Sequence, residues 1–321
     1  MQIFLITLQQ MLTLFLFIMM GFILSRKKIL PQSSDVALSR AATYLFTPAI
    51  NISNMIKNCS VKTFTENSRL ILYGAIMIVC AIIMAELVSC LFVRKTDTKE
   101  NAYQRCIYKY ALTFGNYGFM GYAIILGVWG SEFLFKFQML TFTPAIVCAS
   151  WGLYTLIPKE QNAGLLANLK KGLINPPVIS LFAGMILGLL NMGQYLPAFF
   201  TTFLSNASSC QGPVGMVLAG FVIGCYDLKE MLANKKVYAA TSLRLIVIPA
   251  VLMLILEALG TSKEIMTLAL ILFATPLGLN TIVYPAAYGG ETQTGASMAS
   301  ISHTLSVITI PLMYLVFIVW L

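Results

Sequence analysis

The chain has 321 residues, of which 58% are hydrophobic and only 10% are charged, and its mean hydropathy is +0.82. Soluble domains typically carry about 25% charged residues, so this composition excludes a soluble domain and predicts a polytopic membrane protein. The net charge of +9 does not require a nucleic-acid partner, because in a membrane protein the positions of Lys and Arg report topology.

Apolar runs of about 20 residues, the length that crosses a bilayer, predict ten membrane-spanning helices. In the first half they are spans 1 to 5, at residues 3–24, 37–56, 69–93, 107–129 and 133–157. In the second half they are spans 6 to 10, at residues 174–191, 197–224, 237–258, 265–288 and 293–320. Spans 6 and 7 are separated by the turn-forming residues 191–197.

The basic residues predict the orientation of these spans. The first charges, Arg26, Lys27 and Lys28, follow the first apolar run, which indicates an uncleaved helix with its amino end outside. With that start, sixteen of the 21 basic residues fall on the cytoplasmic side, as expected for a chain in the cytoplasmic membrane with both termini outside. Five spans per half give two repeats of opposite orientation: residues 1–157 and 175–321, joined by a connector at 158–174.

Two of the spans are interrupted at matching positions. Residues 114–123 place three glycines and Asn116 inside span 4, and residues 274–285 place two prolines, Gly278 and Asn280 inside span 9. A shift of 160 residues superposes Gly118 on Gly278. Spans interrupted by Gly or Pro in corresponding positions of two halves indicate the binding site of a secondary transporter.

Asn116 and Asn280 are the main candidates for that site. Each side chain has two interpretations: it satisfies backbone groups freed by the break, or it also donates hydrogen bonds to an anion held near positive half-helix N-termini. The other residues predicted to bind substrate at the breaks are Tyr117, Gly118, Thr275, Pro276 and Gly278. Gly118 and Gly278 are expected to allow close crossing of the backbones. The residues predicted to interrupt helices are Gly115, Gly121, Pro48, Pro213 and Pro285.

Polar residues beside prolines in spans 2 and 7 suggest a second wall of the site. Asn51 follows Pro48, and Gln211 precedes Pro213. The alternative is that both side chains only form hydrogen bonds between helices, as polar residues at membrane depth commonly do.

Ionisable residues inside the spans are few, and each is a candidate for function. Glu86 and Arg244 lie in the repeat-related spans 3 and 8 and are expected to form an ion pair. His303, the single histidine, is a candidate proton relay or a structural residue. The seven cysteines have no metal-ligand spacing, and the chain has no motif of a hydrolase, metalloprotease or phosphate-binding enzyme. We therefore expect no metal, no cofactor and no enzymatic activity.

Several motifs in order resemble the auxin efflux carrier family, which includes plant auxin carriers and bacterial permeases for malate and malonate. They are Leu-Phe-Thr-Pro-Ala at 45–49, Gly-Asn-Tyr-Gly-Phe-Met-Gly at 115–121, Asn-Pro-Pro at 175–177, Thr-Pro-Leu-Gly-Leu-Asn at 275–280 and Tyr-Gly-Gly-Glu at 288–291. One departure is Tyr122, where family members usually have a proline. The long cytoplasmic loop of the plant carriers is also missing, which favours the bacterial permease branch.

The resemblance implies two inverted five-helix repeats in which the broken spans 4 and 9 cross. Spans 1, 2, 6 and 7 are then a scaffold, spans 3–5 and 8–10 a mobile transport domain, and the protein a homodimer in the lipid bilayer. We expect a secondary transporter of a small organic anion, a mono- or dicarboxylate including auxin-like anions, working by alternating access. The alternatives are a ligand sensor without turnover and a cation/proton antiporter, which the absence of Asp or Glu at the midplane disfavours.

Overall fold

The computed structural model describes residues 2–162 and 164–320, so the outermost residue of each predicted repeat and one residue of the predicted connector lie outside the described residues. The described chain is almost entirely helical. Within those ranges, extended pairing is confined to one isolated bridge between Gly115 and Leu277.

The first half of the chain is a series of helices with short π-helical or 3-10 segments between them; η1, η2 and η3 are π-helical and η4 is a 3-10 turn. The elements are α1 (Gln2–Arg26), α2 (Ser34–Ala41), η1 (Ala42–Phe46), α3 (Thr47–Asn58), α4 (Val61–Asn67), α5 (Arg69–Phe92), α6 (Lys99–Thr113), η2 (Tyr117–Gly121), α7 (Tyr122–Trp129), α8 (Ser131–Val147), η3 (Cys148–Gly152), α9 (Leu153–Leu156) and η4 (Lys159–Gln161).

The second half is built in the same way. Its elements are α10 (Leu165–Leu173), α11 (Pro176–Leu189), η5 (Met192–Tyr195), α12 (Ala198–Gly224), α13 (Leu228–Ala233), α14 (Lys235–Ser242), η6 (Leu243–Val247), α15 (Ile248–Ala258), α16 (Lys263–Ala274), α17 (Asn280–Ala287), α18 (Gln293–Tyr314) and η7 (Leu315–Trp320).

In the described part of the chain, six helical segments are long and apolar enough to cross a membrane: Gln2–Arg26, Val61–Phe92, Ser131–Leu156, Ala198–Gly224, Lys235–Ala258 and Gln293–Trp320. The pair α10 and α11, bent by 49°, makes a seventh if it is one span. Large aliphatic side chains such as Leu16, Leu72 and Leu87 are exposed on these helices. Exposed leucines on long apolar helices suit contact with lipid tails, and the helical backbone satisfies its own hydrogen bonds there.

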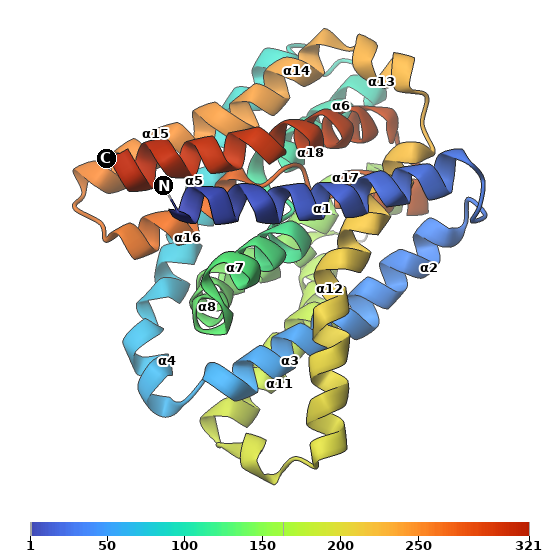
Figure 1. Cartoon of the computed structure of the whole chain (residues 1–321). Helices are drawn as coiled ribbons and strands as arrows, with labels where there is room; N and C mark the ends of the chain where they lie inside the picture. The colour runs from blue at the N-terminus through green and yellow to red at the C-terminus, as the bar shows by residue number, and fades with distance from the viewer. Residues whose placement is uncertain (1, 163, 321) are drawn as a thin grey trace.

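Helices α1, α3, α11 and α12 form one packed group. A Cβ atom on Gly21 of α1 would collide with the Val217 carbonyl, and one on Gly220 of α12 would collide with the Ile18 carbonyl. Only glycine therefore permits the α1–α12 backbone contact, the small-residue packing that membrane helices use in place of hydrophobic collapse. Helix α3 packs on both α11 and α12, in the lower part of Figure 1.

The remaining long helices form a second packed group. Helix α5 lies against α6 and α8, and α18 lies against α14 and α16. Gly74 of α5 contacts the backbone of α8 at Leu140 so closely that a Cβ atom would not fit. Helix α1 touches this second group through α7 and α18, and in Figure 1 it crosses the middle of the view with α18 above it and α7 below it.

Several residues predicted to interrupt helices do not do so. Helix α12 continues through Pro213, Pro285 lies inside α17, and Gly121 lies where η2 continues into α7. Pro48 lies inside a continuous helical run, directly after the π-helical segment η1, whose wider turn accommodates the missing N–H of the proline. Those four predictions are wrong; the non-helical stretches are residues 114–116 and 275–279.

Candidate functional site

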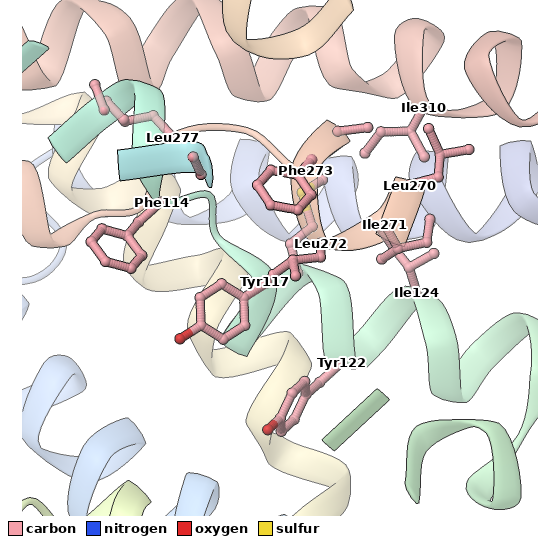
Figure 2. Packing of buried hydrophobic residues seen from close by; sticks show 14 of the residues in the cluster. Phe114, Tyr117, Tyr122, Ile124, Leu270, Ile271, Leu272, Phe273, Leu277 and Ile310 are labelled. Atoms are coloured by element: carbon pink, nitrogen blue, oxygen red, sulfur yellow. The ribbon is translucent and has the colours of Figure 1, made fainter. Parts of the chain in front are cut away.

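The two non-helical stretches contact each other directly. The Asn116 backbone N–H donates to the Pro276 carbonyl at 2.7 Å, and Gly115 bridges Leu277. Figure 2 shows Phe114 and Leu277 on these stretches, with the apolar side chains of α16 from Leu270 to Phe273 packed nearby. Backbone groups that leave the helices at these points are thereby satisfied inside the protein, as lipid requires.

The close contact between the two non-helical stretches requires glycine at position 115, and not at position 118. A Cβ atom on Gly115 would collide with the Arg244 guanidinium, the Thr275 hydroxyl and the Thr275 carbonyl, whereas one on Gly118 would meet nothing within 4 Å. A Cβ atom on Gly278 would lie 3.4 Å from its nearest neighbour, the Gly115 carbonyl oxygen, which is ordinary contact. The expectation that Gly118 and Gly278 both allow close crossing is therefore wrong for Gly118.

A cavity of about 160 Å³ lies beside the two stretches. Its walls come from η1, α3, α6, η2, α7, α8, η3, α11 and α17 together with both non-helical stretches. The polar lining residues are all uncharged: Thr43, Thr47, Asn51, Tyr110, Asn116, Tyr117, Tyr122, Cys148, Asn175, Asn280 and Tyr284. The Tyr117 and Tyr122 hydroxyl groups point to the same side in Figure 2.

Asn116 is held in this wall by a histidine behind it. His303 Nδ1 lies 2.8 Å from the Ala299 carbonyl oxygen, and His303 Nε2 lies 3.2 Å from Asn116 Nδ2. Because a carbonyl only accepts, Nδ1 carries the hydrogen, and in a neutral ring Nε2 then accepts from the Asn116 amide. This uses one amide hydrogen of Asn116 and leaves the second, with the amide oxygen, for another partner.

Asn280 belongs to a cluster that joins three helical elements. Its Nδ2 donates to the Tyr110 hydroxyl at 2.8 Å and lies 3.8 Å from Cys148 Sγ, and that hydroxyl is 3.2 Å from the same sulfur. Tyr110 and Cys148 were not predicted as site residues. A tyrosine in an apolar span is a usable signal, because a buried Tyr hydroxyl usually finds a polar partner.

Two helix N-termini begin at the cavity. The segment η2–α7 starts after Asn116, and α17 starts at Asn280. The first N–H groups of a helix lack intrahelical partners and carry positive partial charge. The residues at both starts, Tyr117 and Gly118 in one and Leu279 and Asn280 in the other, line the cavity. The positive partial charges of both starts thus lie at the cavity, although at α17 the Thr281 and Ile282 N–H groups already donate to the Gly278 and Leu279 carbonyls.

Two polar atoms in the cavity wall have no hydrogen-bond partner within residues 2–162 and 164–320. They are Thr47 Oγ1 and Asn175 Oδ1, and both atoms are buried. A buried polar atom left unpaired costs about 1–3 kcal/mol. Asn175 is the N-cap residue of α11, in the Asn-Pro-Pro motif, and was not predicted as a site residue. These atoms are a reason to expect a polar molecule in the cavity.

The second predicted wall is only partly formed. Asn51 lines the cavity, but its amide donates to the Pro177 carbonyl and the Ser180 hydroxyl, both at 3.0 Å, and accepts from Gln138. This supports the alternative role as a hydrogen-bonded tie between helices. Gln211 does not line the cavity; its amide donates to the Gly118 carbonyl. Thr275 and Pro276 also lie behind the cavity wall.

The predicted ion pair between Glu86 and Arg244 does not form. Glu86 Oε1 lies 2.6 Å from Lys109 Nζ, because α5 packs directly against α6. The Arg244 guanidinium instead donates to backbone carbonyls at the ends of α6 and α16.

The fold and the cavity define a class, that of multi-pass helical membrane proteins with a small polar site enclosed between helix breaks. A family model described as membrane transport protein matches residues 6–167 and again residues 163–314. The chain belongs to this family of membrane transporters, which is that of the auxin efflux carriers. The resemblance noted in the sequence is confirmed. A search of the curated proteins finds no match.

Proposed function

We propose that this chain is a secondary transporter of a small organic anion, a mono- or dicarboxylate, which binds in the cavity beside the two helix breaks. The observation that carries the proposal is the convergence of Asn116, Asn280 and two half-helix N-termini on one uncharged, polar cavity. An ionised carboxylate accepts hydrogen bonds and donates none. Amide hydrogens, tyrosine hydroxyls and helix N-termini are the donors that match it.

The composition of the cavity wall weighs against the cation/proton antiporter. None of the described residues that line it is Asp or Glu, and a cation or proton carrier at membrane depth commonly uses such a carboxylate. A ligand sensor would use the same wall without moving its ligand. Flux across a membrane therefore separates a sensor from a transporter.

The packing supports the architecture that we propose for transport. The group α1, α3, α11 and α12 corresponds to the scaffold, and the group around α5, α6, α8, α16 and α18 corresponds to the transport domain. In this proposal α6 with α7, and α16 with α17, are the crossed broken spans of two inverted five-helix repeats. Alternating access follows if the second group moves against the first, carrying the two helix breaks and the substrate held at them from one side of the membrane to the other.

Two further parts of the proposal concern assembly and orientation. Ten spans with an external N-terminus place both termini outside the cytoplasmic membrane, which cysteine labelling from the outer side of whole cells would check. The homodimer requires contact through the scaffold helices. A monomeric mass in both mild detergent and nanodiscs would count against it.

The main test is transport by purified protein in proteoliposomes. Labelled mono- and dicarboxylates should enter faster than into protein-free liposomes, and Asn280→Ala should slow the uptake. As a control, Asn67→Ala changes an amide that only donates to the Thr63 carbonyl at the end of α4 and should leave the uptake unchanged. Carboxylate binding without uptake would favour the sensor.

A further inference from the structure

Arg244 is a buried cation that has no acidic partner among the residues that the structure describes. Its side chain lies in η6 and the residue is 2% exposed. Nη1 donates to the carbonyls of Leu112 at 3.2 Å and Thr113 at 3.4 Å, and Nη2 donates to the Leu272 carbonyl at 3.4 Å. Within the described ranges 2–162 and 164–320, no carboxylate oxygen lies within 4.0 Å of this guanidinium. Buried charges are normally paired with an opposite charge, so a guanidinium that donates only to backbone carbonyls needs an explanation.

The carbonyls belong to the last turns of two half-helices. Helix α6 ends at Thr113 and α16 ends at Ala274. The last four carbonyls of a helix have no intrahelical partner and carry negative partial charge. One guanidinium therefore donates to two of the last carbonyls of α6 and to one of α16, the Leu272 carbonyl, which also accepts from the Thr275 hydroxyl. In transporters with broken helices, such C-terminal ends coordinate the Na⁺ or H⁺ that drives transport.

We propose that Arg244 is a tethered cation that takes, between the two half-helix C-termini, the place of a coupling Na⁺, so that transport by this chain is independent of sodium. The sodium independence of transport rests on the proposed function, whereas the position of Arg244 between the two C-termini does not. Arg244 lies directly behind the backbone of the cavity-lining Gly115, where its Nη2 and the Thr275 hydroxyl fill the space that a Cβ atom would need. The guanidinium is thus also the fixed positive charge behind a cavity whose own walls are neutral.

A purely space-filling role would make a different prediction. The Arg244 Cζ atom lies 6.0 Å from the centre of the Phe273 ring, so the side chain also packs against an aromatic group. If packing alone mattered, a neutral side chain of similar length would serve as well as a charged one. The comparison of Arg244→Lys with Arg244→Gln separates these roles, because only Lys keeps a cation for the carbonyls.

The first experiment measures thermal unfolding of the full chain in nanodiscs, in sodium chloride and in choline chloride. We expect the wild-type Tm to be the same in both salts, Arg244→Gln to lose several degrees, and Arg244→Lys to lose clearly less. The matched control is Arg105→Gln, which removes a partly buried arginine that donates to the side chains of Ser89 and Cys90, and its loss should be small. A sodium-specific rise of the wild-type Tm, or equal losses for Lys and Gln, would overturn the proposal.

A second pair of variants keeps the arginine, in case Arg244→Gln does not fold. Gly115→Ala places a Cβ atom against both the guanidinium and Thr275 and should lower the Tm, whereas Gly118→Ala, with open space at its Cβ, should not. Equal Tm values for the two variants would contradict the close contact between Gly115 and the Arg244 guanidinium on which the proposal rests. In proteoliposomes, labelled malonate should enter at the same rate with a sodium or a choline gradient, and sodium-dependent entry would overturn the proposal. If no carboxylate enters in either salt, the proposed function fails, and the thermal measurements still decide the role of Arg244.

Discussion

The two helix breaks, at residues 114–116 and 275–279, interrupt their helices by different means. At the first, residues 114–116 contain no proline, and the chain can turn away because Gly115 fits against Arg244 and Thr275 where no larger residue would. At the second, Pro276 lacks an N–H and favours the extended conformation of the preceding residue, and Thr275 is indeed extended. Gly278 there has ordinary space around it. The first break depends on available space and the second on backbone chemistry, so the two should respond differently to substitution.

The largest effect should come from adding a methyl group at the first break. We expect Gly115→Ala to destabilise the fold by about 3 kcal/mol, because overpacking a dense site forces backbone shifts. Gly278→Ala should cost about 1 kcal/mol or less, since its Cβ meets only ordinary contacts. Denaturant unfolding in mixed micelles would measure both. Equal losses would show that the two breaks are held in the same way.

Removing either asparagine tests whether both breaks contribute to binding. Asn116→Ala and Asn280→Ala should each weaken carboxylate binding by roughly 1–3 kcal/mol, the loss expected for a hydrogen bond to a charged group. Ligand-induced shifts in Tm, measured over a series of carboxylate concentrations, would give the affinities.

The asparagine pair also sharpens the comparison between the breaks. Asn116→Ala should reduce stability more than Asn280→Ala, because it leaves the fully buried His303 Nε2 without its donor. Unchanged affinity in both variants would remove the asparagines from the site. The proton-relay role of His303 stays a prediction, which His303→Gln would test by its effect on flux driven by a pH gradient.

A smaller effect is expected at Gly118, which separates binding from folding. The position lines the cavity and has open space at its Cβ, so Gly118→Ala should leave stability nearly unchanged. An added methyl group in a binding pocket changes affinity by about 1 kcal/mol or more, so ligand binding should weaken. A loss of stability comparable to that of Gly115→Ala would mean that the first break needs both glycines.

The smallest effect should appear away from both breaks, at the ion pair of Glu86 and Lys109. Its carboxylate is half exposed, and pairs of this kind contribute about 1 kcal/mol or less. A double-mutant cycle with Glu86→Gln and Lys109→Gln would measure the coupling. The effects of Glu86→Gln and Arg244→Gln should be additive, since these side chains do not meet. Strong coupling between these two substitutions would indicate that the ion pair predicted from the sequence does form.

The sequence was sufficient to locate the breaks, because they arise from local chemistry. Glycine, proline and asparagine weaken a helix wherever they occur together in it. Which neighbour each residue meets depends on the rotation of helices about their axes, which sequence spacing does not determine. For this reason Glu86 was assigned the wrong partner, and the close contact was assigned to Gly118 instead of Gly115.

The site was partly predictable for the same reason. Asn116 and Asn280 stand out as polar residues at interruptions, and both line the cavity. Tyr110 and Cys148 were missed, since each is compatible with an apolar span and acquires a polar role only through a neighbour far away in the chain. Pro213 was assigned to a break although its helix continues, as interior prolines can be tolerated in membrane helices.

The neutral lining of the cavity has an electrical consequence. With no Asp, Glu, His, Lys or Arg among the described lining residues, the wall has no group that ordinarily exchanges a proton near neutral pH to neutralise a bound carboxylate. The protein itself returns to its starting state after each cycle. Without a co-transported ion, the charge moved per turnover is then that of the substrate alone. Moving one elementary charge across the membrane is worth about 2.3 kcal/mol per roughly 100 mV. A negative interior would therefore drive such an anion outward, and flux would be measurable as a current.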